Sequence, residues 1–342
     1  PMTKARENSD YTGLAADIVA GDTAARAGRK NLIINGDNRI SQRGTYTSAL
    51  DFVHNSYLLD RWMAGKSGGS IDGTITHSSD TVNGAVCKTQ KYIVTTGHAG
   101  SWIGGRQILE FPETFIGRTL TVSAWVKSNS DDARILLWDV GSGTNTAIAT
   151  QAHTGGGAWE YLSSTGTVMA GTTGLTLYMA TLSATAAAVT TSTGDYIEFT
   201  NVQIELGSVA TDFEHRSYGE ILADCQRFFE RLEYNSGSML VAHCHGNTAG
   251  ILSVTHSEKR STPSITMPTA AVSGSGGNAV SLLTAAGSYR SSGGSVATDE
   301  ISKNNFRIVF TSWPASGNTG DSTWCYFTSN TGSSHIDIDA EL

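Results

Sequence analysis

Apolar and polar residues alternate with a period of two along much of residues 31–206, which is the pattern of half-buried β-strands. The stretch 120–127 places four aliphatic side chains on one face: Leu120, Val122, Ala124 and Val126. Further strands are predicted at 134–140, 175–180 and 196–206, separated by turns rich in Gly, Ser or Thr. Since no helical period interrupts them, we predict a mainly β fold with an antiparallel β-sandwich at 31–216.

The hydrophobic period changes to that of a helix after residue 216. Ser217 followed by Glu220 forms a capping-box pattern. The apolar residues that follow recur three or four positions apart: Ile221, Leu222, Cys225, Phe228, Phe229 and Leu232. We therefore predict a linking α-helix at 217–234 of roughly four turns. Its apolar stripe would pack against a neighbouring β domain or, alternatively, against a second copy of the chain.

Residues 235–342 return to strand patterns and predict a second, C-terminal β-sandwich. Strands are expected at 239–245, 250–255, 306–310 and 324–327. The closing segment 336–341 alternates strictly and places Asp337, Asp339 and Glu341 on one face. That arrangement is typical of a solvent-facing edge strand whose charges discourage edge-to-edge pairing.

Residues 1–30 form a separate leader before the first β unit. Four of its apolar residues follow helical spacing over two turns: Tyr11, Leu14, Ile18 and Val19. So short an amphipathic piece cannot bury its stripe by itself. It is either a frayed terminus or an N-terminal attachment segment that orders against another protein or a sister chain, and the pattern leaves both interpretations open.

Composition and charge narrow the class of protein. The chain has 342 residues with 38 Gly, 5 Pro and 16% charged residues, which suits short strands joined by many turns. A net charge of −8 argues against a nucleic-acid-binding surface. The sequence contains no apolar run of about 18 residues, so we expect no membrane insertion. The 4 cysteines never form a C-x-x-C pair, and we expect free thiols in a protein made in a reducing cytoplasm.

Two motifs bracket the first β unit. The first is NLIINGD at 31–37, followed by Arg39, Gln42 and Arg43 and then by LDRW at 59–62. The second is VQIELG at 202–207, followed by FEHRSYGE at 213–220 and CQRFF at 225–229.

In this order the two motifs resemble virion structural proteins of tailed bacteriophages, chiefly tail fibres and related appendages. The resemblance covers about residues 31–234 and continues more loosely to Leu342. It implies a jelly roll similar to a carbohydrate-binding module, then a short helix and a second β domain. It also implies a homotrimer located in the virion, made in the bacterial host cytoplasm. Its partners would be other phage virion proteins and a host cell-surface polysaccharide.

Aromatic residues are the candidates for contact with a sugar. Trp125 points away from the aliphatic face of its strand, beside Ser123 and Lys127. Sugar-binding modules present an aromatic ring in such a setting as a stacking platform. Trp159 and Tyr161 share a strand face, and Trp102 lies in a glycine-flanked segment. The alternative is that these rings fill the core or a subunit contact.

A structural calcium is a second candidate feature. The jelly-roll modules that this chain resembles often hold a calcium ion where the first and last strands meet. The oxygen donors at the matching positions here are Asn35, Asp37, Glu198 and Glu205. This chain has Asn201 and Gln203 where such modules carry an acidic pair on the last strand, so we expect no cofactor. We expect Arg39, Arg43, Asp60 and Arg61 to hold the first strand to the loop before Trp62.

Motifs for catalysis are missing from the sequence. It contains no G-x-S-x-G elbow, no H-E-x-x-H and no P-loop, so we expect a protein that is not an enzyme. The leading hypothesis is a tail fibre or appendage that contributes to recognition of a host-surface glycan. A head-decoration or connector protein without host contact is the alternative, and a glycan-degrading enzyme is a third.

Overall fold

The computed structural model divides the chain into two compact units, Pro1–Ser217 and Tyr218–Leu342. The residues that the structure describes are 29–68, 70–141, 145–234, 239–244, 250–267, 280–283, 289–290, 295–311, 322–327 and 334–341. Within these ranges no helix is both long and apolar enough to cross a bilayer. The predicted attachment residues Tyr11, Leu14, Ile18 and Val19 lie outside the described residues.

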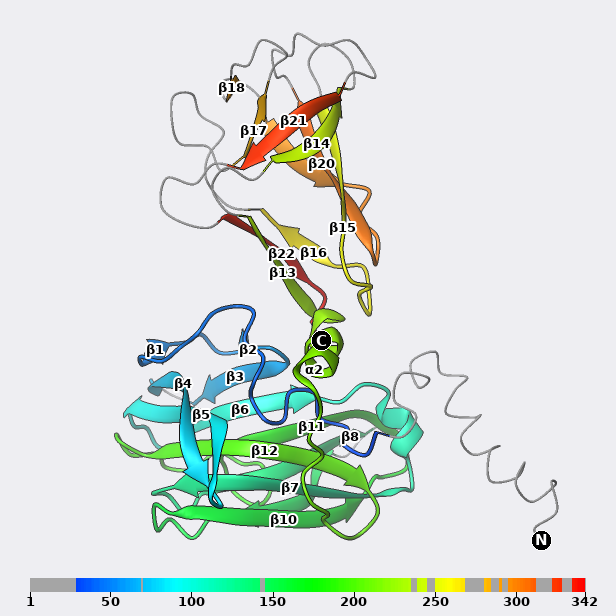
Figure 1. The fold of residues 1–342 in the computed structure, drawn as a ribbon. Helices are drawn as coiled ribbons and strands as arrows, with labels where there is room; N and C mark the ends of the chain where they lie inside the picture. Colours follow the sequence, from blue (N-terminus) through cyan, green and yellow to red (C-terminus); the bar gives the residue numbers. More distant parts are fainter. Residues whose placement is uncertain are drawn as a thin grey trace, which may run out of the picture. The chain divides into compact units, whose positions relative to one another are not determined.

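The first unit is built from two six-stranded antiparallel sheets (Figure 1). The first sheet has the strand order β1 (Leu50–Asp51), β4 (Asp72–Val82), β5 (Ala85–Thr96), β12 (Tyr196–Leu206), β7 (Thr119–Ser128) and β10 (Trp159–Thr167). The second sheet has the order β2 (Ser56–Leu59), β3 (Trp62–Ser67), β6 (Trp102–Ile108), β11 (Thr172–Thr181), β8 (Ala133–Gly141) and β9 (Asn145–Ala152). A 3₁₀ turn, η1 (Pro112–Phe115), precedes β7.

The inner faces of both sheets share one hydrophobic core. Leu120, Val122, Ala124 and Val126 of β7 are fully buried in it, as their alternation predicts. From the second sheet, Trp62 packs its indole against Phe199 of the first, with ring centroids 5.1 Å apart. The predicted jelly-roll β-sandwich is therefore confirmed, and the predicted strands at 120–127, 134–140, 175–180 and 196–206 fall within β7, β8, β11 and β12.

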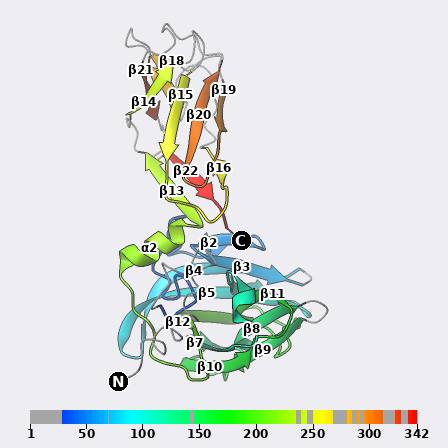
Figure 2. The same cartoon turned by 90° about the vertical axis from the view of Figure 1, so that its right-hand side faces the viewer.

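The second unit begins with α2 (Tyr218–Gln226) and continues as strands in two antiparallel sheets. The smaller sheet has the order β13 (Phe229–Tyr234), β22 (Ser334–Asp339) and β16 (Ser264–Thr266). The larger has the order β18 (Tyr289–Arg290), β17 (Val280–Leu283), β21 (Ser322–Phe327), β14 (Met239–Cys244), β15 (Gly250–Thr255), β20 (Asn305–Thr311) and β19 (Ser295–Asp299) (Figure 2). Buried residues of both sheets, among them Phe306 and Ile338, form one core, which confirms a C-terminal β-sandwich.

The predicted helix at 217–234 is wrong in its second half. α2 ends at Gln226, whose carbonyl accepts a hydrogen bond of 2.6 Å from the ammonium group of Lys259. The amide of Phe228 then turns back to the carbonyl of Cys225, and Phe229 opens β13. The reason is a distant partner, because β13 pairs along its whole length with β22, which lies near the end of the chain.

The interpretation of the closing segment as an edge strand is also wrong. β22 is the central strand of its sheet, paired with β13 on one side and β16 on the other. On its acidic face, Asp337 is neutralised from β13, because Arg231 makes two hydrogen bonds of 2.7 and 2.8 Å to the carboxylate of Asp337. Ile336 and Ile338 on the opposite face are fully buried.

Candidate functional site

The outer face of the first sheet brings three of the four predicted aromatic residues together. Trp125 on β7 lies directly opposite Tyr161 on β10, and their ring centroids are 5.5 Å apart at an angle of 55°. Tyr161 is 43% exposed, and Trp125 is half-buried. We call this pair the aromatic pair. Two partly accessible rings side by side can stack against the apolar face of a sugar.

Hydroxyl groups continue the same face beyond the aromatic pair. Ser163 and Thr165 follow Tyr161 along β10 and are exposed. The hydroxyl of Thr165 lies 3.0 Å from that of Thr121 on β7. A platform of rings beside a row of hydroxyls can both stack on a sugar ring and hydrogen-bond its edge.

Trp159 has a different role from that of the aromatic pair. Its indole NH donates a 3.1 Å hydrogen bond to the carboxylate of Asp80 on β4. Lys127 on β7 binds the same oxygen at 2.9 Å, and its ammonium lies 5.6 Å from the Trp159 ring centroid. This hydrogen bond between Lys127 and Asp80 lowers the pKa of Asp80 and raises the pKa of Lys127. The two charges of this ion pair thus neutralise each other.

The contact between Asp80 and Trp159 also shows that the first sheet curves toward its outer face. β5, β12 and β7 stand between the strands that carry these residues. In a flat sheet β4 and β10 would be about 19 Å apart, at roughly 4.8 Å per strand. The side chains nevertheless touch, because the far end of the β4–β5 hairpin crosses in front of β12 (Figure 1).

Trp102, the fourth aromatic candidate, does not belong to this face. It lies on β6 in the second sheet. Its indole contacts His54 and Tyr178, each with ring centroids 5.8 Å away and planes nearly perpendicular. Sequence reasoning missed Tyr178 and its neighbour Arg106, since nothing local marks them as belonging to one surface.

The four residues considered for calcium do not come together. Glu198 and Glu205 are seven residues apart on β12, about 23 Å at roughly 3.3 Å per residue. Glu198 accepts a hydrogen bond from Thr89, and Glu205 accepts bonds from Thr211 and Gln203. No group of three or more His, Cys, Asp or Glu in the described residues is arranged to hold a metal. The prediction of a shared ligand set was wrong, because the length of β12 separates Glu198 from Glu205.

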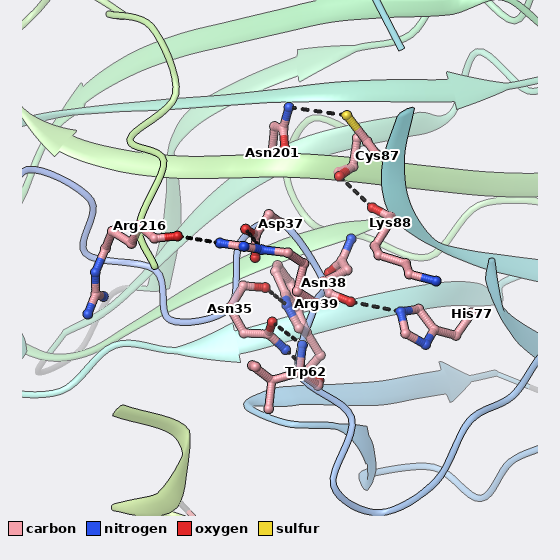
Figure 3. Close-up of polar contacts among 12 residues, drawn as sticks. Asn35, Asp37, Asn38, Arg39, Trp62, His77, Cys87, Lys88, Asn201 and Arg216 are labelled. Atoms are coloured by element: carbon pink, nitrogen blue, oxygen red, sulfur yellow. Dashed lines mark hydrogen bonds and ion pairs between the residues drawn. The ribbon is translucent and has the colours of Figure 1, made fainter. Parts of the chain in front are cut away.

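Asn35 and Asp37 instead belong to a buried hydrogen-bond network (Figure 3). The side chain of Asn35 bonds the backbone of Ile40 in both directions and the carbonyl of Asp60. The indole NH of Trp62 donates to the carbonyl of Asn35 at 2.9 Å. Asp37 pairs with Arg39, which also donates to the carbonyl of Arg216. Asn35 and Asp37 of the first motif therefore have a structural role, because their hydrogen bonds hold this segment in place.

The same network closes the sandwich where its first and last segments meet. The amide of Val202 donates to the carbonyl of Gly36 at 2.9 Å. A Cβ at position 36 would lie 2.1 Å from the Val202 carbonyl oxygen, so only glycine fits. Asp60 accepts bonds from the backbone and side chain of Gln42, and burial raises the pKa of its carboxyl. The contact between Gly36 and Val202 joins the first motif to the second.

Comparisons with known proteins give structural matches of low identity. No family model matches the chain, and no curated protein does. Tailspike protein 4 of bacteriophage CBA120, in its enzymatically active domain, is 15% identical over 52% of this chain and 21% of that one, with a TM-score of 0.34. The chain thus spans about a fifth of the length of that tailspike domain.

Two carbohydrate-binding modules match over nearly their whole length. A xylan-binding domain from Paenibacillus barcinonensis is 15% identical, covering 49% of this chain and 99% of that one, with a TM-score of 0.29. A family 11 module of a Clostridium thermocellum cellulase is 13% identical, covering 51% and 99%, with a TM-score of 0.28. At these identities and TM-scores, what this chain binds has to be inferred from its own side chains.

Proposed function

We propose that this chain is a structural protein of a tailed-phage virion, a tail fibre or appendage, whose jelly-roll unit binds a host-surface glycan without cleaving it. The observation that supports glycan binding is the aromatic pair, Trp125 and Tyr161, next to the exposed hydroxyls of Ser163 and Thr165. The virion role is supported by the paired motifs at 31–62 and 202–229.

The ligand that suits this face is an uncharged part of a polysaccharide. Stacking a sugar on the aromatic pair removes water from the apolar faces of both. Lys127, the cation next to Trp125 on its own strand face, is neutralised by Asp80. Affinity at one such site is low, and three copies in a homotrimer raise the apparent affinity through effective concentration.

Imaging of the intact particle tests the virion role. An antibody against this chain is expected to label the tail or the tips of the baseplate. Label over the head would instead favour the head-decoration or connector alternative.

A second experiment tests for cleavage. The purified protein is mixed with host-surface polysaccharide, and the length of the polysaccharide is followed over time. We expect binding with no shortening of the polymer, whereas release of oligosaccharides would establish a glycan-degrading enzyme.

A further inference from the structure

The outer face of the second sheet carries a separate cluster of polar and aromatic groups, formed by Trp102, Arg106, Tyr178, His54 and Asn55. Trp102 and Arg106 lie on β6, Tyr178 lies on the adjacent strand β11, and His54 and Asn55 precede β2. His54 and Tyr178 stand nearly perpendicular to the indole, at interplanar angles of 77° and 84°. The indole thus contacts two other rings on a partly exposed surface.

Gly65 on β3 makes room for this indole. A Cβ at position 65 would lie 2.3 Å from Cη2 of Trp102 and 2.8 Å from Cζ3. No side chain larger than hydrogen is therefore compatible with the present position of the ring. The six-membered ring of Trp102 covers the backbone of the neighbouring strand while the residue stays half-buried, as a stacking platform requires.

Arg106 places an uncompensated positive charge beside this platform. Its guanidinium donates to the Asn55 side-chain oxygen at 2.6 Å, to the Tyr178 hydroxyl at 3.3 Å and to the Met63 sulfur at 3.0 and 3.1 Å. A thioether is a weak acceptor, and the other two partners are neutral. Across the described ranges, no carboxylate forms an ion pair with Arg106, although the side chain is half-buried.

The charge of the cluster belongs to the guanidinium. Burial, and then the proximity of Arg106, lower the pKa of His54, so this imidazole is neutral near pH 7. The cluster therefore differs from the first sheet, where Asp80 neutralises Lys127. Tyr178 links the two functional groups, since its ring centroid is 5.8 Å from that of Trp102 and 5.9 Å from Cζ of Arg106.

We propose that this cluster is a second carbohydrate site, specific for a sugar residue that carries a carboxylate. One sugar ring stacks on Trp102, and the carboxylate of the same or an adjacent residue receives two parallel N–H bonds from Arg106 in place of the Met63 sulfur. Asn55 and the Tyr178 hydroxyl orient the guanidinium. This site is distinct from the aromatic pair of the proposed function in both position and chemistry.

The test compares acidic oligosaccharides with neutral counterparts. Trimers of galacturonate, glucuronate and mannuronate, each beside its carboxyl-reduced form, are titrated into the full chain by calorimetry. At least one acid is expected to bind about tenfold more tightly than its reduced form, or better, as a hydrogen bond to a charged group implies. Added salt should weaken binding of the acid and leave the reduced form unaffected.

Variants locate the preference for the acid. Arg106→Gln keeps a hydrogen-bonding side chain without the charge and is expected to abolish the preference for the acid. Arg106→Lys keeps the charge and should retain only part of this preference, because lysine lacks the planar fork. Arg118→Gln, the same change at an exposed arginine elsewhere in the unit, should leave it intact. Trp125→Ala removes the platform for uncharged sugar, so it weakens binding of the reduced form and should not abolish the preference for the acid.

Two results would overturn this assignment. One is equal binding of the acidic and reduced forms in every pair, a comparison that needs no variant. The other is an acid preference that persists in correctly folded Arg106→Gln. If that persisting preference is lost in Trp125→Ala, the acidic ligand binds at the aromatic pair, and the proposed function still stands.

Discussion

At the scale of single residues, buried polar side chains hold the loop at 35–40 against both sheets. His77 is one of them: its Nε2 donates to the carbonyl of Asn38 at 2.7 Å, and its Nδ1 is buried without a hydrogen-bond partner. Asn38 also bonds Gln90, which in turn accepts from the Tyr92 hydroxyl. Protonation of His77 would place a charge within this neutral network.

A loss of stability at acid pH follows from His77. Burial is the main cause that lowers its pKa in the folded chain, with Lys88 acting in the same direction and the hydrogen bond to Asn38 opposing both. The unfolded chain takes up the proton near pH 6.5, and the folded chain only at lower pH. Stability is therefore full above about pH 6.5 and falls as the pH drops toward the folded pKa.

Denaturant unfolding at several pH values measures this effect. The expected loss is about 1.4 kcal/mol for each unit by which folding lowers the pKa of His77. In His77→Gln the first unit should lose less stability between about pH 7.5 and about pH 5.5 than the parent chain does. Identical pH profiles of the two proteins would show that His77 does not control acid stability.

At the scale of elements, strands were easier to predict than the helix boundary. The alternation in 120–127 predicts a strand with one buried face, and this pattern within the segment is sufficient to predict the strand. The segment 228–232 fits both periods, because Phe228, Phe229 and Leu232 are spaced as on a helix. Its strand state depends on pairing with β22, a partner that lies far away in sequence. Periodicity within the segment cannot detect such a partner.

Substitution of Phe228 tests the corrected layout of the second unit. Its side chain is 0% exposed, and the guanidinium carbons of Arg227 and Arg260 lie 5.4 and 6.0 Å from its ring centroid. Phe228→Ala should lower the free energy of unfolding by about 3–5 kcal/mol. Tyr218→Ala, at a residue 55% exposed on α2, should change it by less than about 0.5 kcal/mol. Equal effects in chemical denaturation would mean that Phe228 is not packed as described.

Only part of the candidate site could be predicted from the sequence, because the rest depends on pairing between strands. The alternation of β7 placed Trp125 away from the core, and the pairing of β7 with β10 then brought Tyr161 beside it. Trp159 was assigned to the right face, but its bond to Asp80 depends on the curvature of the whole sheet. Arg106 and Tyr178 carry no local signal, because only the pairing of β6 with β11 makes them neighbours.

At the scale of the whole molecule, we predict a homotrimer. The leader stripe at Tyr11, Leu14, Ile18 and Val19 is too short to be stable alone and would order against sister chains. Light scattering of the full chain should give three times its mass of 36.1 kDa. A chain that lacks residues 1–30 should form an assembly with fewer subunits at the same concentration. A monomer with the leader intact, throughout the micromolar range, would contradict this prediction.

The central claim is that the aromatic pair of the jelly roll binds a host-surface glycan, and Trp125→Ala tests it most directly. The measurement is binding of the purified chain to host-cell polysaccharide, with circular dichroism and light scattering on the same samples. We predict that Trp125→Ala weakens binding severalfold or more, since one aromatic stacking contact contributes about 0.5–1.5 kcal/mol beyond its buried area. Fold and oligomeric state should be unchanged, and moderate salt should have little effect. Unchanged binding by a folded Trp125→Ala protein, or unfolding of the unit by this change, would contradict the account.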